Sequence, residues 1–243
     1  MLTLHRAAFV LPDPAGPTAP SIADGAVLVR GESVEAVGPY GELAAAHPGA
    51  RVRDWGAAVL APGLRNPYGH WLLERAYHPD PREEVGVEPV ADGLAGSTDE
   101  TRCGASARRG LQRMLGYGVT AVAGPFERAS VRTAVARSGV VGLPGVVGAA
   151  GAAGVSGASG ELGCAGPAGP VGPLDPLAVL PFREAVYGRV AAGGRADFAV
   201  FAVFAVLATE GVGDGSVGGG GAVPAPGGCL ATVLGGRLVY RRR

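Results

Sequence analysis

Residues 25–38, GAVLVRGESVEAVG, decide the fold of the first part of the chain. A mostly apolar run at 26–30 and an alternating run at 33–37 flank the turn signal Gly31-Glu32. Two such runs around a tight turn are typical of a β-hairpin. We therefore expect paired strands here. Working outward, the same reasoning predicts further strands at 2–10, 51–55 and 57–60, and a short helix at 40–46.

The middle of the chain changes to a helical periodicity. The sequence STDE at 97–100 matches a capping box with Ser97 as the N-cap, and it predicts a helix that runs to about Leu115. A strand is expected at 119–123, a second helix at about 127–137 and another strand at 140–143. This alternation indicates βα units with parallel strand pairing.

The C-terminal part is β-rich again. A helix is expected at 182–190, followed by a strand in which Phe-Ala-Val occurs three times from Phe198. The segments 230–234 and 237–240 predict a closing hairpin around Gly235-Gly236. Because both ends of the chain are β-rich, they can pair in space and leave the middle as an insertion.

Composition excludes several kinds of chemistry and partner. The chain has 21 basic and 21 acidic residues, so its bulk charge gives no reason to expect a nucleic-acid or acidic-membrane partner. Every basic residue is arginine, which excludes Schiff-base chemistry and a carbamylated-lysine metal bridge. The 43 glycines and 20 prolines are spread unevenly, and their excess falls in two tracts, 139–173 and 211–228. A low-complexity loop is expected at about 139–173.

Location is indicated by three further features of the sequence. No apolar run reaches the about 18 residues that a bilayer span needs, and the first residues do not resemble a secretory signal. The three cysteines, at positions 103, 164 and 229, are odd in number and widely spaced. Such thiols favour a reducing compartment over a disulfide framework, so we expect a cytoplasmic protein.

Four stretches, taken in order, resemble the amidohydrolase superfamily. Residues 25–38 resemble its opening paired strands, and APGLRNPYGH at 61–70 resembles the approach to its first barrel strand. The segment from Gly110-Leu111 to GVTAV at 118–122 is similar to its helix-then-strand unit, and 194–201 with 233–240 are similar to its closing hairpins. Within the superfamily the nearest resemblance is to imidazolonepropionase and aminodeoxyfutalosine deaminase, particularly their composite β-sandwich domain.

The resemblance implies an α/β protein with two parts. Residues 1–62 and 193–243 would form the β-sandwich composite domain from both chain ends. Residues 63–192 would form a truncated, TIM-barrel-like α/β insert with a low-complexity loop at about 139–173.

The same resemblance implies a hydrolase that acts on non-peptide carbon–nitrogen bonds of a cyclic amide or amino-heterocycle. In such enzymes a single divalent metal, zinc or iron, activates the attacking water. It is held first by two histidines of an HxH motif, which project from one face of a strand. Here those two positions are Tyr68 and His70, so His70 is the one residue that matches a family ligand. The only other histidines are His5, His47 and His78, so the metal motif is incomplete and no further cofactor is expected.

Two functional hypotheses follow. In the first, His70 transfers a proton or holds the metal, and Asn66, Tyr68, Glu74 and His78 line a substrate pocket. In the second, the chain is a pseudo-enzyme that binds a small molecule or completes a partner's barrel, as part of a homo- or hetero-oligomer that covers the truncated barrel. Both hypotheses compete with a simpler interpretation, in which His70 is an ordinary polar residue and 77–84 is a solvated loop.

Overall fold

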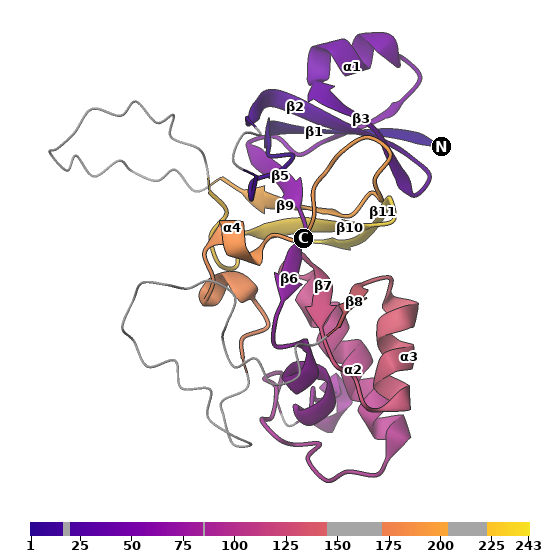
Figure 1. Cartoon of the computed structure of the whole chain (residues 1–243), viewed down its shortest axis with the longest axis vertical. Helices are drawn as coiled ribbons and strands as arrows, with labels where there is room; N and C mark the ends of the chain where they lie inside the picture. The colour runs from indigo at the N-terminus through magenta and orange to yellow at the C-terminus, as the bar shows by residue number, and fades with distance from the viewer. Residues whose placement is uncertain (17–19, 85, 145–171, 204–222) are drawn as a thin grey trace, which may run out of the picture. The chain divides into compact units, whose positions relative to one another are not determined.

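The structure is a computed structural model that describes residues 1–16, 20–84, 86–144, 172–203 and 223–243 (Figure 1). It is a mixed α/β structure with one eight-stranded and one three-stranded sheet. The chain divides into two compact units. Unit 1 comprises Met1–Arg65, Arg113–Ala121 and Asp175–Arg243, and unit 2 comprises Asn66–Gln112 and Val122–Leu174.

The eight-stranded sheet unites both ends of the chain. Its strand order is β11-β10-β9-β5-β1-β2-β3, and β4 also pairs with β1. The strands are β1 (Leu2–Val10), β2 (Ile22–Arg30), β3 (Ser33–Pro39), β4 (Arg51–Asp54), β5 (Ala58–Pro62), β9 (Phe198–Ala202), β10 (Cys229–Leu234) and β11 (Arg237–Arg241). The expected hairpin at 25–38 is thus the antiparallel β2–β3 pair, and β5 and β9 join the two ends in an antiparallel pair.

Both faces of β2 are buried, which explains its nearly continuous apolar run. Val27 and Val29 belong to a core cluster that also includes Phe198 and other residues of β9 and β10. Ala26 and Leu28 lie in a second cluster, against which α1 (Tyr40–Ala46) packs. Successive side chains of a strand point to opposite faces, so a strand covered on both sides has no polar face.

Residues 193–196 pair with the outer side of β3. The Val34 backbone N–H donates to Gly194 O at 2.8 Å, and the Gly193 N–H donates to Val34 O at 2.9 Å. The Ala196 N–H donates to Glu32 O at 2.8 Å. The unpaired N–H and C=O groups of an edge strand can otherwise form hydrogen bonds with a strand of another molecule. Here the segment that leads into β9 satisfies part of this edge.

The middle of the chain confirms the expected alternation of helices and strands. The three-stranded sheet has the order β6-β7-β8, with β6 (Leu64–Asn66), β7 (Val119–Ala123) and β8 (Val141–Leu143). Helix α2 (Glu100–Leu115) precedes β7, and α3 (Ala129–Ser138) connects β7 to β8. A π-helix, η1 (Trp71–Arg75), and a 3₁₀ turn, η2 (Pro81–Glu83), lie between β6 and α2.

Two local expectations require correction. Helix α2 is capped by Asp99, whose side chain accepts from the Arg102 N–H at 3.0 Å, and the expected Ser97 cap was wrong. The helix expected at 182–190 is only α4 (Phe182–Ala185), preceded by the 3₁₀ turn η3 (Pro176–Ala178). It ends at Ala185 because Val186 is extended and forms a β-bridge with Leu64, and Tyr187 donates to Gly63 O at 2.8 Å.

Some expectations fall outside the described residues. They include most of the low-complexity loop, the third Phe-Ala-Val copy and Cys164. Within the described part, no helix combines the length and hydropathy needed to cross a bilayer.

Candidate functional site

The segment that resembles the family's metal motif begins with a buried asparagine at the end of β6. Asn66 Oδ1 accepts from the Tyr68 N–H at 2.8 Å, which closes a tight Asx-type turn directly after the strand. Its Nδ2 donates to Pro173 O at 3.0 Å and to Leu174 O at 3.1 Å. Asn66 therefore uses both ends of its amide to hold backbone.

Tyr68 and His70 do not project from a strand. Because Pro67 and the Asx-type turn end β6 at Asn66, Tyr68 lies in a turn. Its half-buried ring lies against Gly172, where a β-carbon would be 2.1 Å from Tyr68 Cγ. His70 is the N-cap of the π-helix η1, with helical φ and ψ of −55° and −53°. The alternation that would bring the two side chains to one strand face is therefore absent at these two positions.

The His70 ring has a defined orientation. Nδ1 lies 2.7 Å from Pro125 O, and because a carbonyl can only accept, Nδ1 carries the proton. The neutral ring therefore has its lone pair on Nε2. Glu74 Oε2 lies 3.5 Å from Nδ1 and would stabilise the protonated ring. A histidine held in this way is suited to accept a proton at Nε2.

Glu74 has a second role at the start of α3. This nearly fully buried carboxylate accepts from the Arg128 N–H at 2.8 Å. Glu100 accepts from the Ser130 N–H at 2.9 Å. The first N–H groups of a helix have no partner within it, and its N-terminus favours negative charge. Two glutamates from other segments therefore supply the capping that the Arg128 side chain does not give.

An open depression of about 710 Å³ lies beside this pair. The charged and polar side chains that line it are His70, Glu74, Arg75, Glu100, Glu127, Arg128 and Arg132. Of the five candidate residues, only His70 and Glu74 are among them. Sequence reasoning missed Arg128 and Arg132. Their i, i+4 spacing at the start of a predicted helix is a signal that could have found them.

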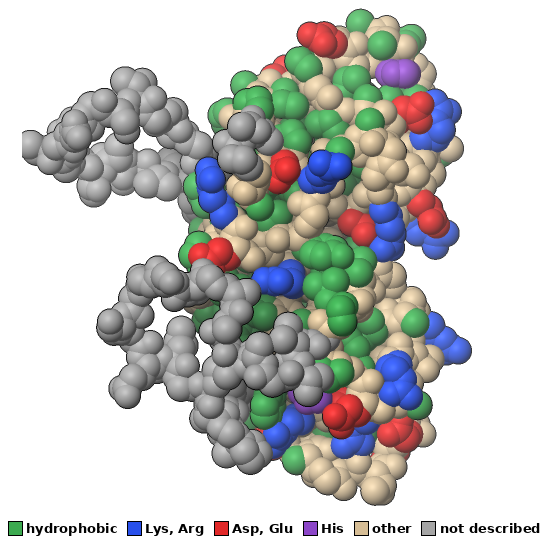
Figure 2. All heavy atoms as spheres, viewed as in Figure 1, with side chains coloured by type: hydrophobic (Ala, Val, Ile, Leu, Met, Phe, Trp, Pro, Cys, Tyr) green, Lys and Arg blue, Asp and Glu red, His purple; other side chains and the backbone are tan. Residues whose placement is uncertain are grey.

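The arginines of the depression mainly hold backbone. Arg128 donates to Ser97 O at 2.6 Å and to Leu94 O at 3.2 Å. Arg132 donates to Glu127 O at 2.6 Å. On the face shown in Figure 2, basic and acidic side chains are interspersed rather than gathered by sign. The depression therefore combines both charges, without an excess of cations free for an anionic ligand.

His78 is fully buried and lies elsewhere in unit 2. Its Nε2 is 2.7 Å from Leu72 O, a carbonyl of η1. A β-carbon at Gly110 would lie 2.6 Å from the same nitrogen, so the ring packs directly on the backbone of α2. These contacts fix η1 against α2, and His78 is not among the residues that line the depression beside His70.

The described residues do not fit the metal that the resemblance implies. His70 commits Nδ1 to a carbonyl, and the nearest carboxylate, Glu74, lies on that side of the ring rather than at Nε2. Within the described ranges, no three His, Cys, Asp or Glu side chains gather closely enough to hold a metal ion. A protein zinc site ordinarily needs at least three such ligands. We therefore derive no reaction step through a metal.

Comparison with known proteins gives one match by sequence family. Residues 25–50, which include β3, α1 and most of β2, match the family described as "Imidazolonepropionase-like composite domain, bacteria". No protein with a curated description matches the chain by sequence.

Solved structures that resemble parts of this chain include three deaminases. Guanine deaminase from Bradyrhizobium japonicum is 19% identical, with a TM-score of 0.45, over 61% of this chain and 35% of that one. Helicobacter pylori aminofutalosine deaminase is 16% identical, with a TM-score of 0.41, over 59% and 33%. An adenosine deaminase from Xanthomonas campestris with bound zinc is 20% identical, with a TM-score of 0.39, over 58% and 33%.

The chain spans only about a third of the length of these deaminases. The sequence match covers the β2–β3 hairpin and α1, and it includes 25–38, one of the four stretches on which the predicted resemblance rests. This confirms the predicted resemblance for residues 25–50, which match an imidazolonepropionase-like composite domain.

Proposed function

We propose that this amidohydrolase-related protein binds a small cyclic amide or amino-heterocycle beside His70, without the metal-assisted hydrolysis of its relatives. The observation that carries the proposal is the structural role of the buried Glu74 carboxylate, which caps α3 through the Arg128 N–H. A carboxylate engaged in this way is poorly placed to bind a metal or to transfer a proton to substrate. The His70 ring is held at Nδ1 by Pro125 O and keeps Nε2 available for a ligand.

The expected ligand follows from the lone pair on His70 Nε2. A ring or exocyclic N–H would donate to this nitrogen, as cyclic amides and amino-heterocycles can. The Trp71 ring lies edge-on to the His70 ring, with 5.9 Å between their centroids. A flat ligand could therefore combine one hydrogen bond with apolar contact, as small-molecule sites commonly do.

A second candidate function is residual hydrolysis of a non-peptide carbon–nitrogen bond. The His70–Glu74 pair favours it, because an oriented imidazole with a carboxylate 3.5 Å from Nδ1 resembles a general base and its supporting group. His70 Nε2 would take a proton from a water molecule as that water attacks the amide or amidine carbon, and would give it to the leaving nitrogen as the carbon–nitrogen bond breaks. Glu74 would stabilise the resulting imidazolium.

We also infer the wider architecture that the family relationship suggests. Residues 1–62 and 193–243 would form the sandwich of the composite domain, and 63–192 would correspond to part of a TIM-type barrel. The order β6-α2-β7-α3-β8 supports this assignment. A homo- or hetero-oligomer would then cover the open barrel strands. Size-exclusion chromatography with light scattering tests self-association, and a strictly monomeric chain would exclude the homo-oligomer.

Metal content, ammonia release and ligand binding together test the function. The full chain, His70→Ala and the control His47→Ala, whose half-buried histidine lies in unit 1, would be analysed by plasma mass spectrometry and titrated with cyclic amides and aminopurines. The binding proposal expects substoichiometric metal, no ring opening or ammonia release, and ligand binding that only His70→Ala abolishes. Ring opening of a cyclic amide, or ammonia release from an aminopurine, that requires His70 but no metal would favour the second candidate. One equivalent of metal that is lost in His70→Ala would overturn both.

A further inference from the structure

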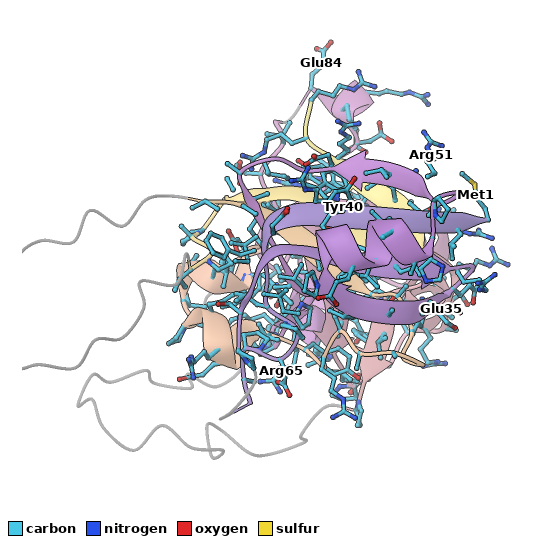
Figure 3. The ribbon with its side chains drawn as sticks, turned by 90° about the horizontal axis from the view of Figure 1, so that it is seen from above. Met1, Glu35, Tyr40, Arg51, Arg65 and Glu84 are labelled. Atoms are coloured by element: carbon cyan, nitrogen blue, oxygen red, sulfur yellow. The ribbon has the colours of Figure 1, made fainter. Side chains whose placement is uncertain are left out.

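Two outer strands of the eight-stranded sheet bring three arginines together in unit 1. Arg51 and Arg53 are two residues apart on β4, so their side chains leave the same face of that strand. Among the described strands, β4 pairs only with β1, in the register Thr3↔Arg51 and His5↔Arg53. Arg237 is the first residue of β11, which pairs only with β10 in the described part of the chain. Figure 3 shows Arg51 beside Met1 at one end of the sheet.

These arginines line one hollow of about 360 Å³. Thr3, Val29 and Leu238 also line the hollow, and no acidic residue is part of its lining. Arg51, Arg53 and Arg237 form no ion pair with any residue that the structure describes. By contrast, Arg6 and Arg30 in the same sheet are paired with carboxylates at 2.7 Å.

Three unneutralised guanidinium groups give the hollow a positive potential. A neighbouring titrating side chain is affected by this charge: His5 pairs with Arg53 in the β1–β4 register. Burial, and secondarily the charge of Arg53, lower the pKa of the His5 imidazole to about 3. Like charges that converge without counter-charges repel one another, and an anion that binds between them relieves the repulsion.

We propose that this hollow is a binding site for an organic phosphate monoester. The planar fork of arginine matches phosphate oxygens in two-point hydrogen bonds, and several arginines favour a doubly charged group over a single carboxylate. The Thr3 hydroxyl supplies a further donor, and Val29 and Leu238 supply apolar walls for the organic part. The volume suits a small ligand. This site is separate from the proposed function at His70.

Calorimetric titration of the full chain with phenyl phosphate and with inorganic phosphate, at constant ionic strength, tests the proposal. We expect saturable binding of both anions, which is tighter for the ester. The double variant Arg51→Gln/Arg53→Gln should weaken binding by about tenfold or more, because each charge-assisted hydrogen bond lost is large enough for that effect. The control Arg65→Gln removes an exposed arginine that lies away from the hollow and should bind as the parent does (Figure 3).

The outcomes separate clearly. Arg51→Lys/Arg53→Lys keeps the charge but loses the fork, so intermediate binding would support recognition of the phosphate group. A circular dichroism spectrum equal to that of the parent confirms that each variant is folded. Equal heats with phosphate and with chloride would overturn the proposal, as would parent-like binding by the double glutamine variant. Binding of heparin without binding of phenyl phosphate would also overturn the proposal, because it would show that the arginines bind polyanions in general and not a phosphate monoester.

Discussion

Gly63 lies against Thr120 so closely that a β-carbon at position 63 would be 2.1 Å from both Thr120 Oγ1 and Cγ2. The backbone here cannot easily move away, because Gly63 O accepts from the Tyr187 N–H and the Leu64 N–H donates to Gly118 O, each at 2.8 Å. We predict that Gly63→Ala lowers the free energy of unfolding by about 1–3 kcal/mol, the usual cost of overpacking a core. Urea denaturation measures this change.

The matched control for Gly63 is Gly41→Ala. Gly41 lies in α1, and a β-carbon there would meet no atom within 4 Å. Alanine in this helix should leave stability unchanged or raise it by about 0.5–1 kcal/mol. Adding Thr120→Ala to Gly63→Ala should recover part of the loss. Equal stability of Gly63→Ala and the parent would show that the close approach does not exist.

Glu74 provides the second prediction, since its carboxylate caps α3. Glu74→Ala removes the acceptor of the half-buried Arg128 N–H, and we expect the free energy of unfolding to fall by about 1–3 kcal/mol. Glu74→Gln keeps an acceptor oxygen but loses the charge at the helix N-terminus, so its loss should be smaller. Thermal unfolding followed by circular dichroism tests this order. The exposed Glu42→Ala is a suitable control, and equal effects of the two Glu74 substitutions would argue against a cap.

Local sequence signals predicted much of the fold. The β2–β3 hairpin, β7 and the β10–β11 hairpin all lie within one or a few residues of their expected ranges. Gly235 and Gly236 show why: their φ values of +50° and +71° are those of a tight turn that glycine adopts readily. In these segments periodicity and turn chemistry act between near neighbours, so the sequence alone reveals them.

The site was much less predictable, because contacts between distant residues determine it. Glu74 meets Arg128 across 54 positions of the sequence, and His70 meets Pro125 across 55. Family resemblance located His70, but it implied a strand where the Asx-type turn of Asn66 and the π-helix place a helical residue. No local pattern of the sequence encodes these partners.

The third prediction concerns Asn66, and the Asn66→Ala variant tests whether this residue supports the fold or binds a ligand. Asn66→Ala leaves two carbonyls without the donor they have now and removes the acceptor of the Tyr68 N–H. We expect a loss of stability of about 2–4 kcal/mol, the sum of two or more buried hydrogen bonds. Ligand binding at His70, measured below the melting temperature, should remain. Loss of binding in a variant of unchanged stability would instead place Asn66 in the pocket.

His5 gives the fourth prediction, a dependence of stability on pH. Its ring is fully buried, accepts from Trp55 Nε1 at 3.4 Å and meets the Phe198 ring edge-on at 5.0 Å between centroids. Burial first, and then the charge of Arg53, lower its pKa from 6.5 to about 3. The folded protein therefore binds fewer protons than the unfolded chain between these two values. The contribution of His5 to stability is complete above pH 6.5 and is lost as the pH falls toward 3.

Carboxylates also titrate in the lower part of this pH range, so the contribution of His5 to stability must be separated from theirs. Comparison of the parent with a His5 variant makes this separation. In His5→Phe the aromatic contacts remain but the titrating group is gone. The difference in unfolding free energy between variant and parent should change by up to about 1.4 kcal/mol per pH unit below pH 6, in favour of the variant. It should be constant above pH 7. Urea titrations at intervals from neutral pH to about pH 4 measure it. Parallel stability curves across this range would mean that folding leaves the pKa of His5 unchanged, which would contradict the lowered value.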